Sequence, residues 1–390
     1  IIGWNKRIDN RHHAIDALTV ACTQQSHIQR LNTLNANKEA FTKLDATTNE
    51  GYRAFIKRVA QEAPFTTAEV LEAADNIIVS FKPITKSTTP GKRKVFKNGK
   101  PIIKQTGILV PRGELTEETV YGLIQRYDGK GGFNACSVVR YPLSKITSQA
   151  DANSIVDEGI KQIVKKRLKE HNDNPKIAFS TPLYSDVAQT KEIKGVRCFS
   201  GHKRASLAIV KRDENGKPIG FSPTGNNHNV AFYLNENGKP VELVCSFYHA
   251  IQRRLFNIPT IIENPSEVWD LIETSGKEFS EEFLSQLPNP KWTFAFSLQK
   301  NEMAIIGLTK NDFEYALQNG DKKTLAQHLY KVQSISHNSY CFTRHTETKY
   351  DKNHANKPDE RFLRYKSASS LLRDFTAKVS INVIGDIIKK

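Results

Sequence analysis

The chain has 390 residues, enough for two or three domains, because most domains hold about 100–200 residues. Lys and Arg total 57 against 41 Asp and Glu, so the formal net charge is +16 at pH 7. An excess of this size indicates a polyanionic partner, most often nucleic acid, with an ordinary basic protein as the alternative. No apolar run approaches the roughly 20 residues that cross a bilayer, so we expect no membrane-spanning segment.

The five cysteines are widely spaced and form no Cys-x-x-Cys pair, which argues against a disulfide framework and against a structural zinc site. Their pattern fits a reducing cytoplasm. The single methionine is Met303, and the chain opens on Ile1-Ile2-Gly3-Trp4 without a basic-then-apolar leader. We therefore expect the chain to be a piece of a longer protein.

The N-terminal part is predicted to be helical. Apolar residues recur at helical spacing over residues 10–34, a second helix is expected over 50–62, and a capping-box pattern at Thr66 predicts a third helix through about Ala74. Residues 76–81 are expected to form a strand.

Residues 86–105 hold seven basic residues and no acidic one. Their centre contains Asn98-Gly99, the turn pair typical of a two-residue β-hairpin. A basic hairpin is suited to contact a phosphate backbone, whereas a solvated loop is the structural alternative. Beyond it we expect a helix over 116–126, a glycine-rich hinge at 128–132 and a Lys-rich helix over 154–171.

The second half is predicted to be rich in β structure, with hairpins at Asn215-Gly216 and Asn237-Gly238. The last third alternates short predicted elements. The helices are expected at 281–286, 311–318 and 323–330, and the strands at 293–298, 303–308, 331–335, 339–343 and 379–384.

The residues most suited to chemistry lie at the start of the first predicted helix. His12 and His13 stand four and three residues before Asp16, so that all three share one helical face. A carboxylate beside an imidazole can hold a divalent metal and position or deprotonate a water, which metal-assisted phosphodiester hydrolysis requires. The alternative is a structural His–Asp hydrogen bond near a helix start.

The sequence His-His-Ala-Ile-Asp-Ala at 12–17 resembles the third RuvC segment of the type II CRISPR-associated, RNA-guided DNA endonucleases. Residues 112–122 resemble the RuvC-to-wedge passage of the compact type II-C members. Residues 138–143, 225–231 and 381–387 resemble later positions of the same family. The resemblance implies an α/β and α+β multidomain chain: the end of an RNase H-like RuvC domain (1–128), a β-rich wedge domain (129–250) and a domain that reads the DNA motif beside the target, the PAM (251–390).

By the same resemblance Asp16 is a ligand of Mg²⁺ or Mn²⁺ and His13 is the catalytic histidine beside it. His12 matches a preceding family histidine, to which we assign no direct role. The family's site needs two further carboxylates from earlier segments, which this sequence does not hold, so the chain alone is expected not to cut DNA. The implied partners are guide RNA (crRNA paired with tracrRNA), target DNA with its PAM and the missing N-terminal part of the same protein, in a prokaryotic cytoplasm.

Seven residues are our candidates for nucleic-acid contacts. Basic side chains on the hairpin and just after it can contact a phosphate backbone and so orient the nucleic acid. Base edges, in contrast, are read by side chains on a rigid support. The candidates are Lys92, Arg93, Lys94, Arg112, Arg344, His345 and Lys349.

Two other functions stay open. A RuvC-like nuclease of a mobile element could share the His-His-Ala-x-Asp-Ala helix, although such proteins usually lack so large a β-rich tail. A non-catalytic nucleic-acid-binding module, in which the RuvC remnant is only structural, is the second.

Overall fold

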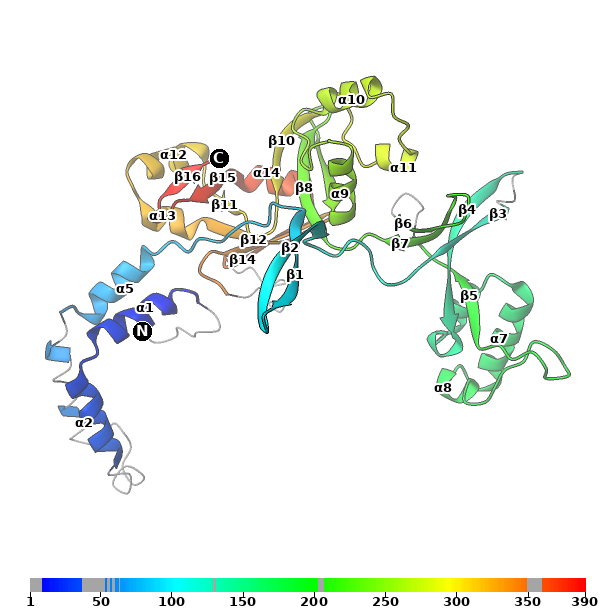
Figure 1. Cartoon of the computed structure of the whole chain (residues 1–390), viewed down its shortest axis with the longest axis horizontal. Coiled ribbons are helices and arrows are strands. Elements are labelled where there is room, and N and C mark those ends of the chain that lie inside the picture. Colours follow the sequence, from blue (N-terminus) through cyan, green and yellow to red (C-terminus); the bar gives the residue numbers. More distant parts are fainter. Residues whose placement is uncertain are drawn as a thin grey trace. The chain divides into compact units, whose positions relative to one another are not determined.

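The computed structural model describes residues 9–36, 53–54, 57, 60–62, 64–127, 129, 131–202, 207–348 and 360–390. They belong to two compact units that alternate along the chain (Figure 1). Unit 1 comprises residues 1–85, 229–242 and 294–390, and unit 2 comprises residues 86–228 and 243–293. None of the helices in the described part is long and apolar enough to cross a membrane.

The described N-terminal residues of unit 1 include the helices α1 (His12–Cys22), α2 (Gln25–Ala36) and α5 (Thr67–Asp75). The start of α5 has the predicted capping box: the Thr66 side chain accepts from the Glu69 backbone N–H, and the Glu69 carboxylate accepts from the Thr66 backbone N–H. Hydrogen bonds to Thr66 lower the pKa of Glu69 below its ordinary value, because they favour the ionised carboxylate.

The body of unit 1 is a six-stranded antiparallel sheet in the order β14-β13-β12-β11-β15-β16. Its core is apolar and includes Ile305, Phe313, Leu329 and Val379. The elements are β11 (Met303–Ile306), α12 (Lys310–Gln318), α13 (Lys322–Gln327), β12 (Leu329–Ser336), β13 (Ser339–Arg344), β14 (Phe362–Tyr365), α14 (Ala368–Asp374), β15 (Phe375–Ile381) and β16 (Ile387–Lys389).

Residues 229–234, 240–242 and 294–298 of unit 1 belong to a three-stranded sheet in the order β10-β8-β9, formed by β8 (Asn227–Leu234), β9 (Pro240–Ser246) and β10 (Thr293–Leu298). Aromatic side chains of unit 1 pack around it. Phe296 stacks on Phe375 with ring centroids 3.9 Å apart, and Phe232 contacts both Phe296 and Tyr340.

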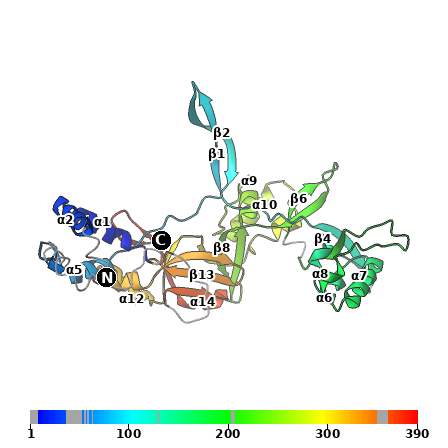
Figure 2. The same cartoon turned by 90° about the horizontal axis from the view of Figure 1, so that it is seen from below.

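Unit 2 opens on a hairpin that forms a two-stranded sheet by itself, β1 (Thr88–Lys97) and β2 (Lys100–Pro111) (Figure 2). A three-stranded sheet and a second hairpin follow, and helices cover part of them. These elements are β3 (Gly122–Tyr127), β4 (Phe133–Pro142), the 3₁₀ turn η1 (Leu143–Lys145), α6 (Gln149–Asn153), α7 (Glu158–Glu170), α8 (Pro175–Ala178), β5 (Gly195–Phe199), β6 (Leu207–Arg212), β7 (Pro218–Pro223), α9 (Phe247–Leu255), α10 (Pro265–Thr274) and α11 (Glu281–Leu284).

The expected mixture of helices and β-rich regions is confirmed. The hairpin at Asn98-Gly99 is also confirmed, with both turn residues at positive φ (52° and 74°), as a type I′ turn requires. Hairpins lie at the other two Asn-Gly pairs, but there only the glycine has positive φ. Their loops are longer, and the Asp213 and Asn235 side chains accept hydrogen bonds from loop amides.

Several predicted elements were wrong. Residues 10–34 form two helices rather than one, because Thr23 is extended (ψ 121°) between them. Residues 76–81 form no strand. The helix expected over 116–126 is wrong too: residues 122–127 form β3, which pairs with β4 from Gly122↔Val138 to Tyr127↔Phe133. The helix expected over 323–330 ends at Gln327, where β12 follows. The helix expected over 50–62 lies mostly outside the described residues.

A hinge is expected at the glycine-rich residues 128–132; of these, Gly129, Gly131 and Gly132 lie between β3 and β4, and Asp128 and Lys130 are outside the described residues. The sequence did not indicate α9, α10, α14 or β14. The division into domains 1–128, 129–250 and 251–390 stays a prediction.

Candidate metal site and nucleic-acid contacts

Backbone contacts of Asp9 and Asn10 with Thr346 and Glu347 hold the start of α1 next to the residues that follow β13. We call this set of contacts the tether. Asp9 pairs with Glu347 as an isolated antiparallel bridge, and the Asn10 N–H donates to the Thr346 carbonyl oxygen at 2.7 Å. Arg11 grips the Asp9 carboxylate: its Nη2 lies 2.8 Å from Oδ2 and its Nε lies 3.2 Å from both carboxylate oxygens. Asp9, Thr346 and Glu347 are buried, so the tether is shielded from water.

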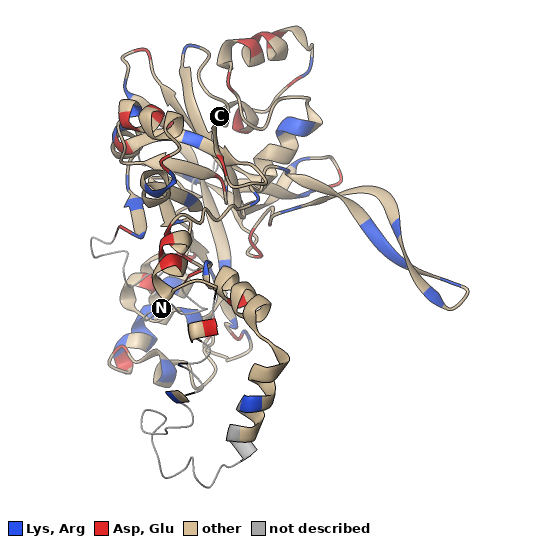
Figure 3. Cartoon of the chain, turned by 90° about the vertical axis from the view of Figure 1, so that its left-hand side faces the viewer, with Lys and Arg blue, Asp and Glu red and all other residues tan. Residues whose placement is uncertain are grey.

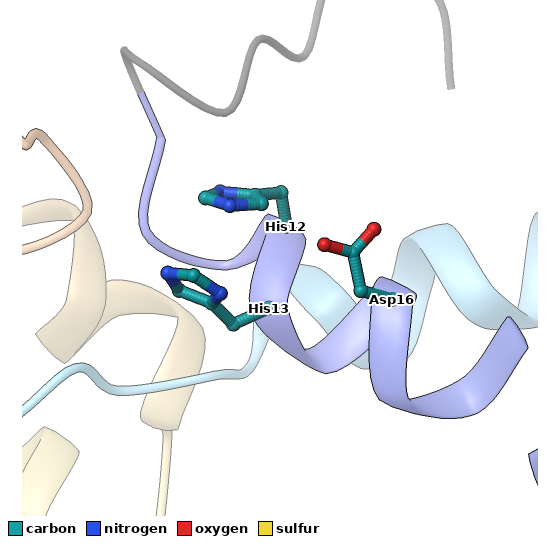
Figure 4. Close-up of side chains that lie close together, drawn as sticks. All are labelled: His12, His13 and Asp16. Atoms are coloured by element: carbon teal, nitrogen blue, oxygen red, sulfur yellow. The ribbon is translucent and has the colours of Figure 1, made fainter. Parts of the chain in front are cut away.

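Three candidate ligands follow directly on this tether. His12, His13 and Asp16 lie on the first turns of α1, and one ligand atom from each lies within 4.8 Å of the others (Figure 4). His12 is buried, Asp16 is half-buried and His13 is exposed. The rings of the two histidines lie in contact, with centroids 4.0 Å apart. Within the described ranges this is the single group of three or more His, Cys, Asp or Glu residues with such geometry.

The tautomer of His12 follows from its partner. His12 Nδ1 lies at hydrogen-bonding distance from the Asp9 carbonyl oxygen, and a carbonyl only accepts, so Nδ1 carries the proton. The lone pair is then on Nε2, the nitrogen that can bind a metal. A backbone carbonyl that fixes the ring in this way is a common outer partner of metal-binding histidines.

These residues fit part of a divalent-metal site. Mg²⁺ prefers six oxygen ligands in octahedral geometry, whereas this group offers one carboxylate and two imidazoles. Imidazole is better suited to Mn²⁺ and later transition metals. These three side chains can therefore supply part of the ligand set of a metal site. A two-metal centre needs further carboxylates from outside this group.

The predicted contact residues near β13 lie in different environments. Arg344 is half-buried, and its Nη2 lies 3.6 Å from Glu360 Oε2. It lines a small pocket together with Arg11 and Lys323. His345 is 1% exposed and its Nδ1 accepts a hydrogen bond from the Val79 N–H at 3.0 Å. Lys349 lies outside the described residues.

The burial of His345 argues against the predicted base contact, because no base edge can reach a ring enclosed by its own unit. Burial, together with the charge of Arg11, lowers the pKa of His345 to about 4. The ring is therefore neutral at pH 7, and its acceptor nitrogen is used to hold the segment that follows α5.

The contact residues predicted at the hairpin are accessible. Lys92, Arg93 and Lys94 are exposed on β1, and Lys94 Nζ lies 5.5 Å from the centroid of the Phe96 ring. Arg112 is exposed just beyond β2, and its backbone N–H donates to the Ser87 carbonyl oxygen at 3.0 Å.

Two features of this site were not predicted from the sequence. His12 was given no direct role, yet it belongs to the ligand group. The ion pair between Asp9 and Arg11 was not predicted either. An acidic and a basic residue two positions apart just before a helix could have suggested an ion pair that fixes the start of the helix. The contacts of Asp9 and Asn10 with Thr346 and Glu347 join segments more than 330 residues apart, which no local pattern shows.

Comparison with known proteins agrees with the motif at residues 12–17. Residues 1–86 match the family model described as RuvC endonuclease subdomain 3. No curated protein matches the chain.

Among solved structures, the chain is similar to Streptococcus thermophilus Cas9 in complex with AGGA PAM, at 15% identity and a TM-score of 0.47, over 99% of this chain and 34% of that one. It is also similar to Corynebacterium diphtheriae Cas9 in complex with sgRNA and target DNA (14% identity, TM-score 0.40, 99% and 40% coverage). The type II-C Cas9 from Actinomyces naeslundii gives 13% identity, a TM-score of 0.39 and coverages of 99% and 41%. The chain thus spans between a third and two fifths of the length of these three proteins. The family match agrees with the resemblance of the helix motif, because the N-terminal 86 residues of this chain are similar to RuvC endonuclease subdomain 3.

Proposed function

We propose that this chain is the C-terminal part of a type II CRISPR RNA-guided DNA endonuclease and that α1 supplies one corner of its RuvC metal site. The observation that carries the proposal is the convergence of His12, His13 and Asp16 on the start of a helix that lies within the RuvC match. The reaction is hydrolysis of a phosphodiester bond in the DNA strand displaced by the guide RNA.

The three side chains have distinct roles in this proposal. Asp16 offers carboxylate oxygens, the ligands that Mg²⁺ and Mn²⁺ prefer. When bound, such an ion neutralises charge on the scissile phosphate and acidifies a water molecule. His13 is exposed beside Asp16 and can orient or deprotonate the attacking water, and His12 presents Nε2 from its fixed tautomer.

The remaining metal ligands have to come from another segment of the full-length protein. The uncovered apolar surface of α1 supports docking of such a segment. An apolar groove beside the ligand group is lined by Ile15, Leu18, Phe65 and Val70. Val20 on α1 is 75% exposed. An amphipathic helix that leaves apolar surface uncovered needs a partner. We propose that the partner is the sheet formed by the earlier RuvC segments, which would also bring the missing carboxylates.

The rest of the chain would bind nucleic acid. The net charge of +16 and the exposed basic side chains of the β1–β2 hairpin support binding to a phosphate backbone. Arg112 and Arg344 stay candidates for contacts with guide RNA or with PAM-containing DNA, and so does Lys349. His345 is a buried structural residue and is left out of this set.

The test combines the purified chain with the N-terminal part, guide RNA, target DNA and Mg²⁺. We expect cutting of the displaced strand to be restored, Asp16→Asn to abolish it, and His13→Ala to slow it by roughly 10²–10⁴-fold. Asp270→Asn makes the same chemical change on the exposed surface of α10 and should leave cutting intact. Calorimetric titration of the assembled protein with Mn²⁺, without DNA, should show weaker binding for Asp16→Asn alone.

Two results would contradict this assignment. Cutting by the chain alone would refute the argument that its site is incomplete. Normal cutting by Asp16→Asn would refute the assignment of Asp16. The non-catalytic binding module predicts salt-dependent binding to nucleic acid with no restoration of cutting by any N-terminal part.

A further inference from the structure

The β1–β2 hairpin has two chemically different faces. Successive residues of a strand point to opposite faces, and residues paired across an antiparallel hairpin share a face. The register therefore assigns every basic side chain of the hairpin to one face or the other. Both faces are accessible, because among the described strands β1 and β2 pair only with each other, and almost all their residues are exposed.

One face carries two like-charge pairs. Arg93 lies directly opposite Lys104, and Lys97 lies directly opposite Lys100. Between these pairs, on the same face, Val95 lies opposite Ile102. We call this set of four cations the cationic ladder. Figure 3 shows the basic positions in blue along the hairpin, and residues 86–111 hold no acidic residue that could neutralise them.

The opposite face has a different pattern. Lys92 lies opposite Gln105, Lys94 opposite Ile103, and Phe96 opposite Pro101. Each lysine there faces a neutral partner, and Lys94 approaches the Phe96 ring. This face also presents large exposed apolar groups, since Phe96 is 68% and Ile103 is 70% exposed.

The ladder is unfavourable in the free chain. Like charges directly opposite each other destabilise an antiparallel pair, and a lone two-stranded hairpin is marginally stable at best. An anion placed between the two members of a pair removes this repulsion. The two pairs are four residues apart along the strand, about 13 Å at about 3.3 Å per residue, which is too far for one phosphate group to contact both.

A polyanion with regularly spaced charges fits this arrangement. We infer that the cationic ladder, and not the opposite face of the hairpin, is a nucleic-acid backbone site, in which separate phosphates bridge the Arg93–Lys104 and Lys97–Lys100 pairs. The inference deepens the proposed function and rests on it. It adds Lys97, Lys100 and Lys104 to the contact residues and moves Lys92 and Lys94 away from the backbone.

The test uses two matched double variants of the full chain. Lys97→Gln/Lys100→Gln removes one ladder pair, and Lys92→Gln/Lys94→Gln removes the same charge from the other face of the same hairpin. Affinity for a DNA duplex and for an RNA stem–loop is measured across a salt series. For the ligand that uses the ladder, the slope of log affinity against log salt should fall by about 2 in the ladder variant and by much less in the control.

A charge-preserving variant completes the design. Lys97→Arg/Lys100→Arg should retain the wild-type slope, which separates loss of charge from damage to the hairpin. Near-ultraviolet and far-ultraviolet circular dichroism of all variants should superimpose. The comparison of duplex and stem–loop then identifies whether DNA or RNA is the source of the phosphates.

Three outcomes would overturn the inference while leaving the proposed function standing. They are an equal loss of slope in both double variants, a larger loss in the Lys92/Lys94 variant, and no loss in either. Equally strong ladder-dependent binding to vesicles of anionic lipid would overturn the assignment to nucleic acid. If the wild-type chain binds neither duplex nor stem–loop, the proposed function itself fails.

Discussion

Removing Arg11 should loosen the tether that holds the start of α1. The Arg11 guanidinium contacts the Asp9 carboxylate at 2.8–3.2 Å, donates to the Ala74 carbonyl oxygen at 3.3 Å and lies 3.2 Å from Asp75. Arg11→Leu leaves the Asp9 carboxylate, whose side chain is 11% exposed, without this partner.

The free-energy cost of Arg11→Leu follows from the burial of its ion pair with Asp9. Breaking a buried ion pair by removing one partner costs about 3–5 kcal/mol, because the other charge stays buried and uncompensated. The Asp75 contact adds little, since that side chain is 50% exposed and exposed pairs contribute about 0–1 kcal/mol. We therefore expect a local cost of about 3 kcal/mol, near the lower end of the buried range.

Native-state hydrogen exchange measures this cost where it occurs. The Asn10 amide donates to the Thr346 carbonyl oxygen across the two segments, so its exchange reports opening of the tether. About 3 kcal/mol corresponds to exchange faster by on the order of 10²-fold. Arg30→Leu, on the exposed surface of α2, is the control and should leave the exchange rate of the Asn10 amide unchanged.

A double variant tests whether the buried charge of Asp9 causes the loss of protection in Arg11→Leu. Arg11→Leu/Asp9→Asn removes the uncompensated charge and should recover part of the protection that Arg11→Leu loses. Exchange within about threefold of wild type in Arg11→Leu would show that the pair does not hold the tether. Equal protection in the single and double variants would show that buried charge is not the reason for the loss.

Two further predictions concern packing and pH. Gly113→Ala would place a Cβ 2.3–2.7 Å from three carbons of the Phe247 ring and should destabilise unit 2 by about 1–3 kcal/mol in urea unfolding, whereas Gly201→Ala, where a Cβ meets open space, should be close to neutral. Because the folded state holds the pKa of His345 at about 4, below the ordinary 6.5, its neutral form stabilises unit 1 fully above about pH 6.5, and this contribution is lost as the pH falls towards 4. Stability should drop by roughly 2 kcal/mol by about pH 5, and His345→Gln should remove that part of the pH dependence; an unchanged pH profile in the variant would refute it.

Local chemistry explains what the sequence could predict. The Asn98-Gly99 turn needs only two residues with positive φ, and the capping box needs only Thr66 and Glu69, so both are visible in a few letters. The ligand group is also local, since His12, His13 and Asp16 follow from the spacing of one helix.

Long-range pairing explains the errors. Residues 116–126 have the composition of a helix, but β4 supplies hydrogen-bonding partners for residues 122–127, and pairing overrides propensity. Residues 76–81 have the β-branched composition of a strand but no strand partner, and the Val79 N–H is satisfied by His345, 266 positions away. The same contact buries His345, which the sequence presents as one of several polar residues in a basic stretch.

The lysines of the β1–β2 hairpin have a second consequence, for the behaviour of the chain in solution. A two-stranded sheet exposes the backbone donors and acceptors of both outer edges, and here the exposed apolar residues include Ile103, Ile108 and Val110. Such an edge can pair with another copy, and charged residues and prolines along it oppose that pairing. Pro90, Pro101 and the basic residues thus act as gatekeepers against self-association. Variants that lower the charge of the hairpin should therefore be studied at low protein concentration, because the residues that attract a polyanion also keep the free strands apart.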